Sequence, residues 1–166
     1  MPPDPAPEFS RPLPLGTVAQ AGRRLSLTAT PEECAALADR FGILSIESLA
    51  AELRLSLEEG GTVRVEGRIA ASLTQACIVT LEPVAEVVDE PVAFRLLPPG
   101  REPQDGPDDI DEIECPDGTA DLGEAVAEQL ALALDPYPRA PGAELPEEAT
   151  DRSADAFAAL AALRKN

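Results

Sequence analysis

The feature that most constrains this chain is a long alternation of apolar and polar side chains on both sides of one turn. Apolar residues occupy the odd positions from residue 49 to residue 58, and the same phase returns from residue 63 to residue 74. A period of two is typical of a strand with one buried face. Between the two runs, Glu58-Glu-Gly-Gly61 supplies glycines for a hairpin turn. We therefore predict two long antiparallel strands with one face in water.

Several shorter runs predict further strands. Residues 9–15 alternate but contain two prolines, which indicates an edge strand or an extended arm. Residues 23–29 predict a short strand, and residues 84–97 a third long one in which Pro91 marks a bulge or an edge. Ile110, Ile113 and Cys115 indicate a short strand within an acidic loop.

Two helices have clear start and stop signals. Thr30-Pro-Glu-Glu33 forms a capping box with proline at the first helical position, and Gly42 is placed to end a helix over residues 31–41. Asp121-Leu-Gly-Glu124 opens a second helix over residues 121–134, which Pro136 stops. A weaker amphipathic pattern over residues 153–165 predicts a C-terminal helix, either docked or mobile.

These elements predict an α+β fold, in which an antiparallel β-sheet of four to six strands has the two helices packed on it and the termini are flexible. Residues 1–8 hold four prolines, which predicts a disordered N-terminus. Residues 9–139 then form a single domain that includes an acidic loop at 98–118. Residues 140–166 form a linker and a short C-terminal helix.

Charge is distributed unevenly along the chain. Lys and Arg number 13 against 31 Asp and Glu, a net charge of −18. The net charge is −3 over residues 1–68 and −15 over residues 69–166. Such a field attracts basic partners and repels phosphate backbones, or it only keeps a protein soluble and monomeric, and both interpretations stay open. The pair Arg23 and Arg24 either touches a polyanion or forms the solvated end of a turn.

Residue types exclude most catalytic and metal chemistry. The chain has no histidine, and Cys34, Cys77 and Cys115 are widely spaced, so neither a disulfide framework nor zinc spacing is present. No Gly-rich phosphate loop occurs, and the carboxylates of residues 105–117 fit a solvated loop better than a calcium loop. We expect no enzyme, cofactor or bound metal. Without a signal peptide or a membrane-length apolar run, we expect a cytoplasmic protein.

The central stretch, residues 75–84, is unusually apolar for so acidic a chain. Continued alternation predicts that Cys77, Val79 and Leu81 point inward and Thr80 outward. Gln75 lies on the inward row, where a polar group needs a partner or marks an opening. Two interpretations follow: a strand end and turn closed by Pro83, or a surface feature built around Cys77, Thr80 and Glu82.

The order of these parts resembles the YceD family, bacterial proteins with plastid relatives associated with accumulation of the 23S ribosomal RNA. The resemblance runs from about residue 8 to residue 142, and the form Pro-Tyr-Pro-Arg139 is similar to the alphaproteobacterial branch. The residues that match the family's Cys-x-x-Cys-Leu-x-Pro-Val motif and its helix are Cys77, Leu81, Pro83, Val84, Leu122, Glu128, Leu130, Leu132, Leu134 and Pro136. Thr80 stands where many relatives have the second cysteine, and no cysteine follows Pro138. For this reason we expect the motif to serve packing or docking.

The resemblance implies a non-enzymatic factor in ribosome biogenesis, needed for synthesis, processing or stability of the 23S rRNA. We expect a monomer, without membrane contact, that binds a basic large-subunit ribosomal protein or assembly factor, or reaches the 23S rRNA directly or indirectly. The docking candidates are Gln75, Cys77, Thr80, Leu81, Glu82, Pro83, Tyr137 and Arg139. The candidates for an RNA-facing side are Arg23, Arg24, Arg64 and Arg68. Two alternatives are a metal-binding or redox protein using Cys77, and an acidic adaptor for a basic protein unrelated to ribosomes.

Overall fold

The structure is a computed structural model that describes residues 6–104, 106 and 110–144. Three expectations fall partly outside these residues: the disordered N-terminus 1–8, the acidic loop 98–118, and the C-terminal segment 140–166. The predicted helix at 153–165 lies wholly outside them. The elements in chain order are β1 (Pro12–Pro14), η1 (Leu15–Thr17), β2 (Arg23–Thr28), α1 (Pro31–Phe41), β3 (Ser45–Leu57), η2 (Glu59–Gly61), β4 (Val63–Ala76), β5 (Pro83–Leu97), β6 (Asp111–Glu114), β7 (Thr119–Asp121) and α2 (Leu122–Ala133).

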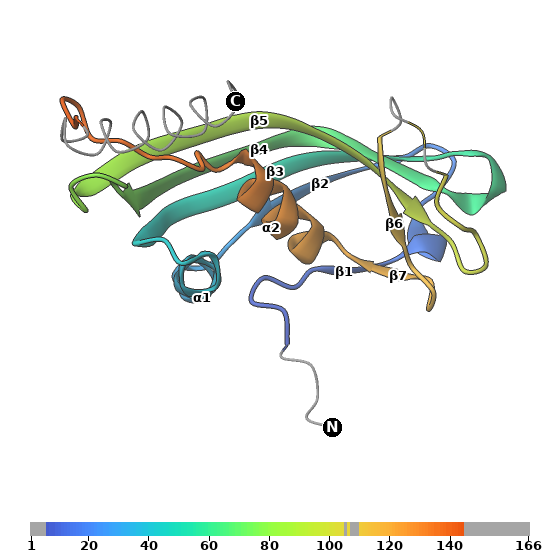
Figure 1. The fold of residues 1–166 in the computed structure, drawn as a ribbon. Coiled ribbons are helices and arrows are strands. Elements are labelled where there is room, and N and C mark those ends of the chain that lie inside the picture. Colours follow the sequence, from blue (N-terminus) through green and yellow to red (C-terminus); the bar gives the residue numbers. More distant parts are fainter. Residues whose placement is uncertain (1–5, 105, 107–109, 145–166) are drawn as a thin grey trace, which may run out of the picture.

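Five strands form one curved sheet in the order β2-β3-β4-β5-β6, and β1 pairs with β7 in a separate two-stranded sheet (Figure 1). The α+β class and both helices are confirmed. One strand differs from the expected antiparallel arrangement, because β6 runs parallel to the last residues of β5. The connection over residues 98–110 is long enough to bring the chain back along β5, as parallel pairing requires.

The predicted hairpin is confirmed in its register. Leu55 lies opposite Val65, and both are buried, whereas Arg54 lies opposite Glu66 on the other face. Gly60 and Gly61 both have positive φ, which the turn requires. Pro91 lies opposite Arg68 of β4, and the register shows no bulge there. On the other side of β5, β6 pairs only with residues 94–97, so among the described strands Pro91 lies at an edge of the sheet, as one of the two interpretations expected.

The helix caps form as the sequence predicts. The Thr30 hydroxyl accepts the Glu33 N–H, the Glu33 carboxylate accepts the Thr30 N–H, and Gly42 closes α1 with a φ of 67°. The Asp121 carboxylate accepts the Glu124 N–H at the start of α2. It also accepts the backbone N–H of Arg11, which ties α2 to the strand pair of β1 and β7.

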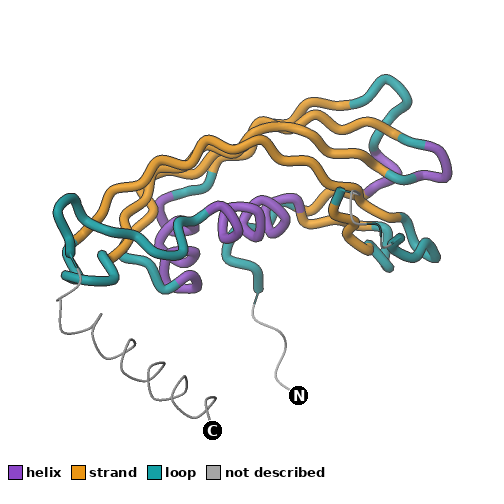
Figure 2. Tube along the Cα trace, turned by 45° about the horizontal axis from the view of Figure 1, so that its top comes forward, coloured by secondary structure: helices purple, strands orange, loops and turns teal. Residues whose placement is uncertain are grey.

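Both helices and the β1–β7 pair lie on the concave side of the sheet, and the two views agree on this (Figures 1 and 2). The core between these layers contains the inward side chains of β3, β4 and β5 together with those of α1 and α2. In the part of the chain that the structure describes, no element covers the other side of the sheet. We call this side the outer face.

Candidate functional site

The chain turns sharply between β4 and β5, and we call residues 77–82 the Cys77 turn. The Cys77 N–H donates to the Glu82 carbonyl at 2.8 Å, and the Leu81 N–H donates to the Cys77 carbonyl at 3.0 Å. Cys77 is buried, as predicted, but the alternation does not continue past it. The prediction that Leu81 points inward is therefore wrong, since Leu81 has a φ of 62° and is 76% exposed, whereas Val79 is half-buried.

The Cys77 sulfur is surrounded by backbone donors. It accepts N–H groups from Ala140 at 3.2 Å, Val79 at 3.4 Å and Thr80 at 3.5 Å. These donors, that of Ala140 most of all, lower the pKa of the Cys77 thiol to about 7, although desolvation opposes the shift. The side chain thus joins the Cys77 turn to the segment that follows α2.

Gln75, which lies on β4 two residues before Cys77, holds the same segment. Its amide nitrogen donates to the Glu86 carboxylate at 2.8 Å and to the Asp135 carbonyl at 3.0 Å, while Glu86 also accepts the Asp135 N–H. The Ile78 N–H donates to the Pro138 carbonyl at 2.9 Å. The sequence left two interpretations for a polar group on the inward row, a hydrogen-bonded partner or an opening. The hydrogen bonds of Gln75 support the first.

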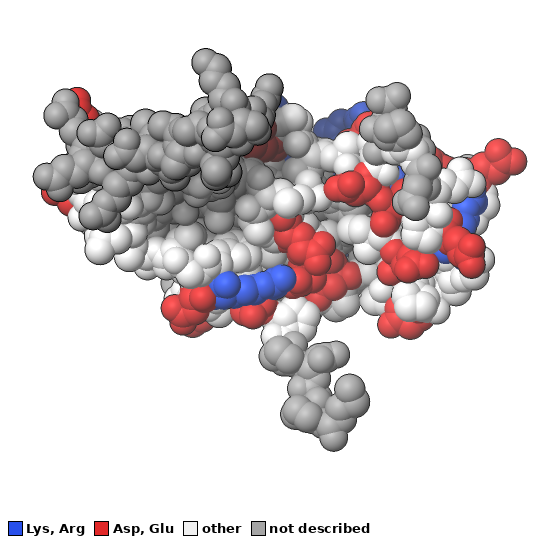
Figure 3. Space-filling view, in the orientation of Figure 1, with Lys and Arg blue, Asp and Glu red and all other residues white. Residues whose placement is uncertain are grey.

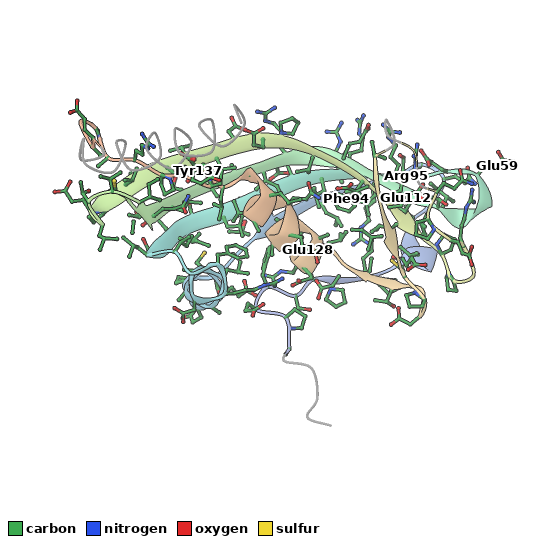
Figure 4. All side chains as sticks on the ribbon, in the orientation of Figure 1. Glu59, Phe94, Arg95, Glu112, Glu128 and Tyr137 are labelled. Carbon is green, nitrogen blue, oxygen red and sulfur yellow. The ribbon has the colours of Figure 1, made fainter. Side chains whose placement is uncertain are left out.

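The structure divides the predicted docking residues into two groups. Gln75 and Cys77 are buried and hold the turn against residues 135–140. The exposed ones lie on this turn and segment, and we call them the motif surface: Thr80, Leu81, Glu82, Pro83, Tyr137 and Arg139. Tyr137 is 70% exposed, at the exit from α2 (Figure 4). A docking role for these residues stays a prediction.

The predicted RNA-facing arginines come from two different faces. Arg24, Arg64 and Arg68 lie on the outer face, since their strand partners there are Arg54, Arg95 and Glu52. Arg23 lies opposite the buried Leu55, so it belongs to the concave side of the strand edge. Sequence reasoning missed Arg54 and Arg95, although Arg54 occupies a polar position of the alternation that predicted the hairpin.

An acidic groove lies between β6 and α2, at the other edge of the sheet from β2. A hollow of about 390 Å³ there is lined by Asp111, Glu112 and Glu128, and it adjoins a second hollow lined by Glu90. Leu132, which is 77% exposed, lines both hollows. Among the described residues no Lys or Arg lines either hollow.

The groove belongs to a broadly acidic side of the molecule. Carboxylates outnumber basic groups over α2 and β6 (Figure 3), and Glu112 and Glu128 project from these two neighbouring elements (Figure 4). Sequence reasoning predicted an acidic body here but not a groove, because β6 and α2 come together only in the fold.

The described residues do not fit a structural metal site. Within the described ranges no group of three or more Cys, Asp or Glu is arranged to hold a metal ion. A closed zinc site needs four such ligands, and at the Cys77 turn the residue three positions after the thiol is Thr80. Cys34 and Cys115 are free and buried, and burial raises the pKa of both thiols.

No helix in the described part of the chain is both long and apolar enough to cross a membrane.

Comparison with known proteins gives one match. The family described as "Large ribosomal RNA subunit accumulation protein YceD" matches residues 65–164, more than half of the chain. The matched range begins in β4 and includes the Cys77 turn, β5, β6 and α2, so it contains the acidic groove and the motif surface. No curated protein and no solved structure matches the chain significantly.

Proposed function

The chain belongs to the YceD family of large ribosomal RNA subunit accumulation proteins, and from this membership we propose that it acts by binding a basic large-subunit protein in its acidic groove. The membership gives it a role in accumulation of the large-subunit rRNA. We propose that this role is non-enzymatic, that it is exercised in the cytoplasm by a monomer, and that the rRNA concerned is the 23S rRNA. The acidic groove is the observation that carries the proposal.

The lining of the groove fits a basic, partly apolar segment of a partner. Asp111 and Glu128 are exposed, so their charges can face a ligand, and Glu112 is half-buried, so part of its hydration is already lost. Leu132 offers an apolar contact between the two hollows. Proteins that contact rRNA phosphates carry clustered Lys and Arg. Before assembly those side chains lack their phosphate partners, and an acidic groove can hold them.

The motif surface supplies a second contact in this proposal. Leu81 and Tyr137 are both strongly exposed, and tyrosine is one of the residue types that most often anchor an interface. Gln75 and Cys77 act indirectly, because their hydrogen bonds hold the Cys77 turn against the segment that carries Tyr137. Loss of either should disturb the surface through loss of its support.

A deletion strain tests the biological role. We expect a lowered ratio of 23S to 16S rRNA during growth at low temperature, restored by the wild-type gene. The groove variant Glu112→Gln/Glu128→Gln should restore it poorly. Glu32→Gln/Asp39→Asn on α1 changes the net charge by the same amount at exposed positions outside the groove and should restore it fully. A normal ratio in the deletion strain would refute the ribosomal role.

A further inference from the structure

Four arginines gather at one end of the outer face. They come from four adjacent strands: Arg24 from β2, Arg54 from β3, Arg64 from β4 and Arg95 from β5. Arg54 and Arg64 are diagonal neighbours, because Arg64 lies opposite Ser56. We call these four residues the arginine cluster. A concentration of positive charge on one face is unexpected in a chain with a net charge of −18.

The strand register places these arginines in two like-charged pairs. Arg24 lies directly opposite Arg54, and Arg64 directly opposite Arg95. Like charges in opposite positions of a sheet lower its stability. Glu58 partly offsets the second pair, since its carboxylate is 2.9 Å from Arg95 and 3.8 Å from Arg64, and Glu66 pairs with Arg64 at 2.8 Å.

The first pair has no such compensation. Of the described carboxylates, none has an oxygen within 4 Å of a guanidinium nitrogen of Arg24 or Arg54. Glu66, which lies opposite Arg54, pairs with Arg64 instead, and the neighbouring Glu52 accepts a hydrogen bond from Ser26. Two exposed arginines thus lie side by side at a cost to the stability of the sheet, and among the described residues no side-chain acceptor pairs with their guanidinium groups.

A hollow opens beside this pair. Its volume is about 340 Å³, and its lining includes Arg23, Arg24 and Arg54 but no described carboxylate. Gly22 lets the chain pass closely over β3 here: it has a φ of 78°, and a Cβ at this position would meet the Leu55 carbonyl oxygen at 2.8 Å. Arg23 comes from the concave side of the strand edge, so arginines from both faces border one hollow.

We infer that this hollow and the arginine cluster bind the phosphate backbone of RNA. Guanidinium groups match phosphate oxygens with paired N–H donors, and Arg24 and Arg54 have donors to offer. This inference rests on the proposed function for the choice of RNA as the polyanion. It assigns RNA to the outer face and the basic protein to the groove. The Arg24–Arg54 pair lies near the β2 edge of the sheet and the groove at the β6 edge, so one chain can hold both.

The composition of the outer face also predicts how RNA is recognised. Phe9 and Phe94 are buried in the core, and Tyr137 belongs to the motif surface. No aromatic side chain of the described strands lies among the arginines. Proteins that bind single strands usually combine positive charge with aromatic side chains that stack on the bases, and here only the charge is present on these strands. We therefore expect contact with the backbone and little preference for base sequence.

Fluorescence anisotropy with labelled RNA tests the inference directly. The probes are a short fluorescein-labelled transcript of large-subunit rRNA and an unrelated transcript of equal length, titrated with the full chain between about 50 and 200 mM salt. The variants are Arg24→Gln, Arg54→Gln and the double variant Arg24→Gln/Arg54→Gln. Arg101→Gln is the matched control, since Arg101 does not line the hollow beside Arg24 and Arg54 and its loss changes the charge by the same amount as each single variant.

We expect each cluster substitution to weaken RNA binding, and the double variant to bind about tenfold more weakly at the higher salt. The slope of log affinity against log salt should fall by about 0.7 to 0.9 for each arginine removed. The affinity should change little in Arg101→Gln, and it should also change little when the unrelated transcript replaces the rRNA transcript. Thermal unfolding separates binding from structure: the double variant should be as stable as the wild type or more so, because a like-charged pair is gone.

Three results would overturn the inference: no RNA binding by the wild type at about 50 mM salt, equal binding by the double variant and Arg101→Gln, or a double variant that loses affinity only because it unfolds. None of them bears on the groove. Capture of large-subunit proteins by the groove is measured separately, after RNase treatment, so failure of the RNA site and failure of the proposed function are distinguishable.

Discussion

Replacing Gln75 tests how the family motif is held to the rest of the protein. In Gln75→Ala the Asp135 carbonyl loses its side-chain donor, and the Glu86 carboxylate loses one of its two described hydrogen bonds. A neutral hydrogen bond contributes about 0.5–1.5 kcal/mol and one to a charged group about 1.5–3 kcal/mol. Glu86 is half-exposed and can regain water, which lowers its share. We therefore expect the free energy of unfolding to fall by about 2 kcal/mol.

The assay is urea unfolding of four proteins that form a double-mutant cycle: wild type, Gln75→Ala, Glu86→Ala and the double variant. We expect a coupling energy of about 1–2 kcal/mol between the two side chains, since they are in direct contact. Gln129→Ala is the control, because its amide reaches Asp111 only at 3.5 Å and should cost less than about 0.5 kcal/mol.

The reasoning would be refuted by a Gln75→Ala protein as stable as the Gln129→Ala control, with no coupling to Glu86. The segment 135–140 would then be held by other contacts, and Gln75 would be free to serve a partner. If stability falls as expected, any loss of function in Gln75→Ala should be proportional to the loss of stability.

Two further predictions concern the thiol of the motif and the packing of the hairpin. The pKa of Cys77 is about 7 in the folded chain against an ordinary value of 9.0, so the folded state favours the thiolate. The free energy of unfolding should therefore rise between pH 7 and pH 9, and this added stability should be lost as the pH falls through 7. In Cys77→Ser the rise should vanish. A rise of equal size in the variant would contradict the assignment of the pKa to Cys77. Cys34 and Cys115 act in the opposite sense and only above pH 9, because burial raises their pKa. Gly67→Ala should lower stability by about 1–3 kcal/mol, since its Cβ would lie 1.9 Å from the Glu52 carbonyl oxygen, and a variant with unchanged urea midpoint would show that the two strands are not so close.

Local patterns predicted much of this fold because the features concerned are local. The alternation predicted which faces of β3 and β4 are buried, and the capping residues of α1 predicted both of its ends. The alternation could not predict where β4 ends. That depends on hydrogen bonds that close the Cys77 turn, and Leu81 consequently points outward.

The parts that sequence reasoning missed depend on contacts between distant segments. The parallel pairing of β6 with β5 and the groove between β6 and α2 arise only when β6 lies beside the last residues of β5. The arginine cluster depends on strand register: Arg54 and Arg95 join it because they lie opposite Arg24 and Arg64. Adjacent residues of one strand face opposite sides, which places Arg24 on the outer face and Arg23 on the concave side.

The most direct test of the acidic groove is a tagged pull-down from growing cells, with one half of each sample treated with RNase. The wild-type chain and the Glu32→Gln/Asp39→Asn control should keep large-subunit proteins after digestion, whereas Glu112→Gln/Glu128→Gln should lose them. If all proteins leave the wild-type chain on digestion and only 23S rRNA is enriched before it, the groove does not bind a ribosomal protein, and the central claim is wrong.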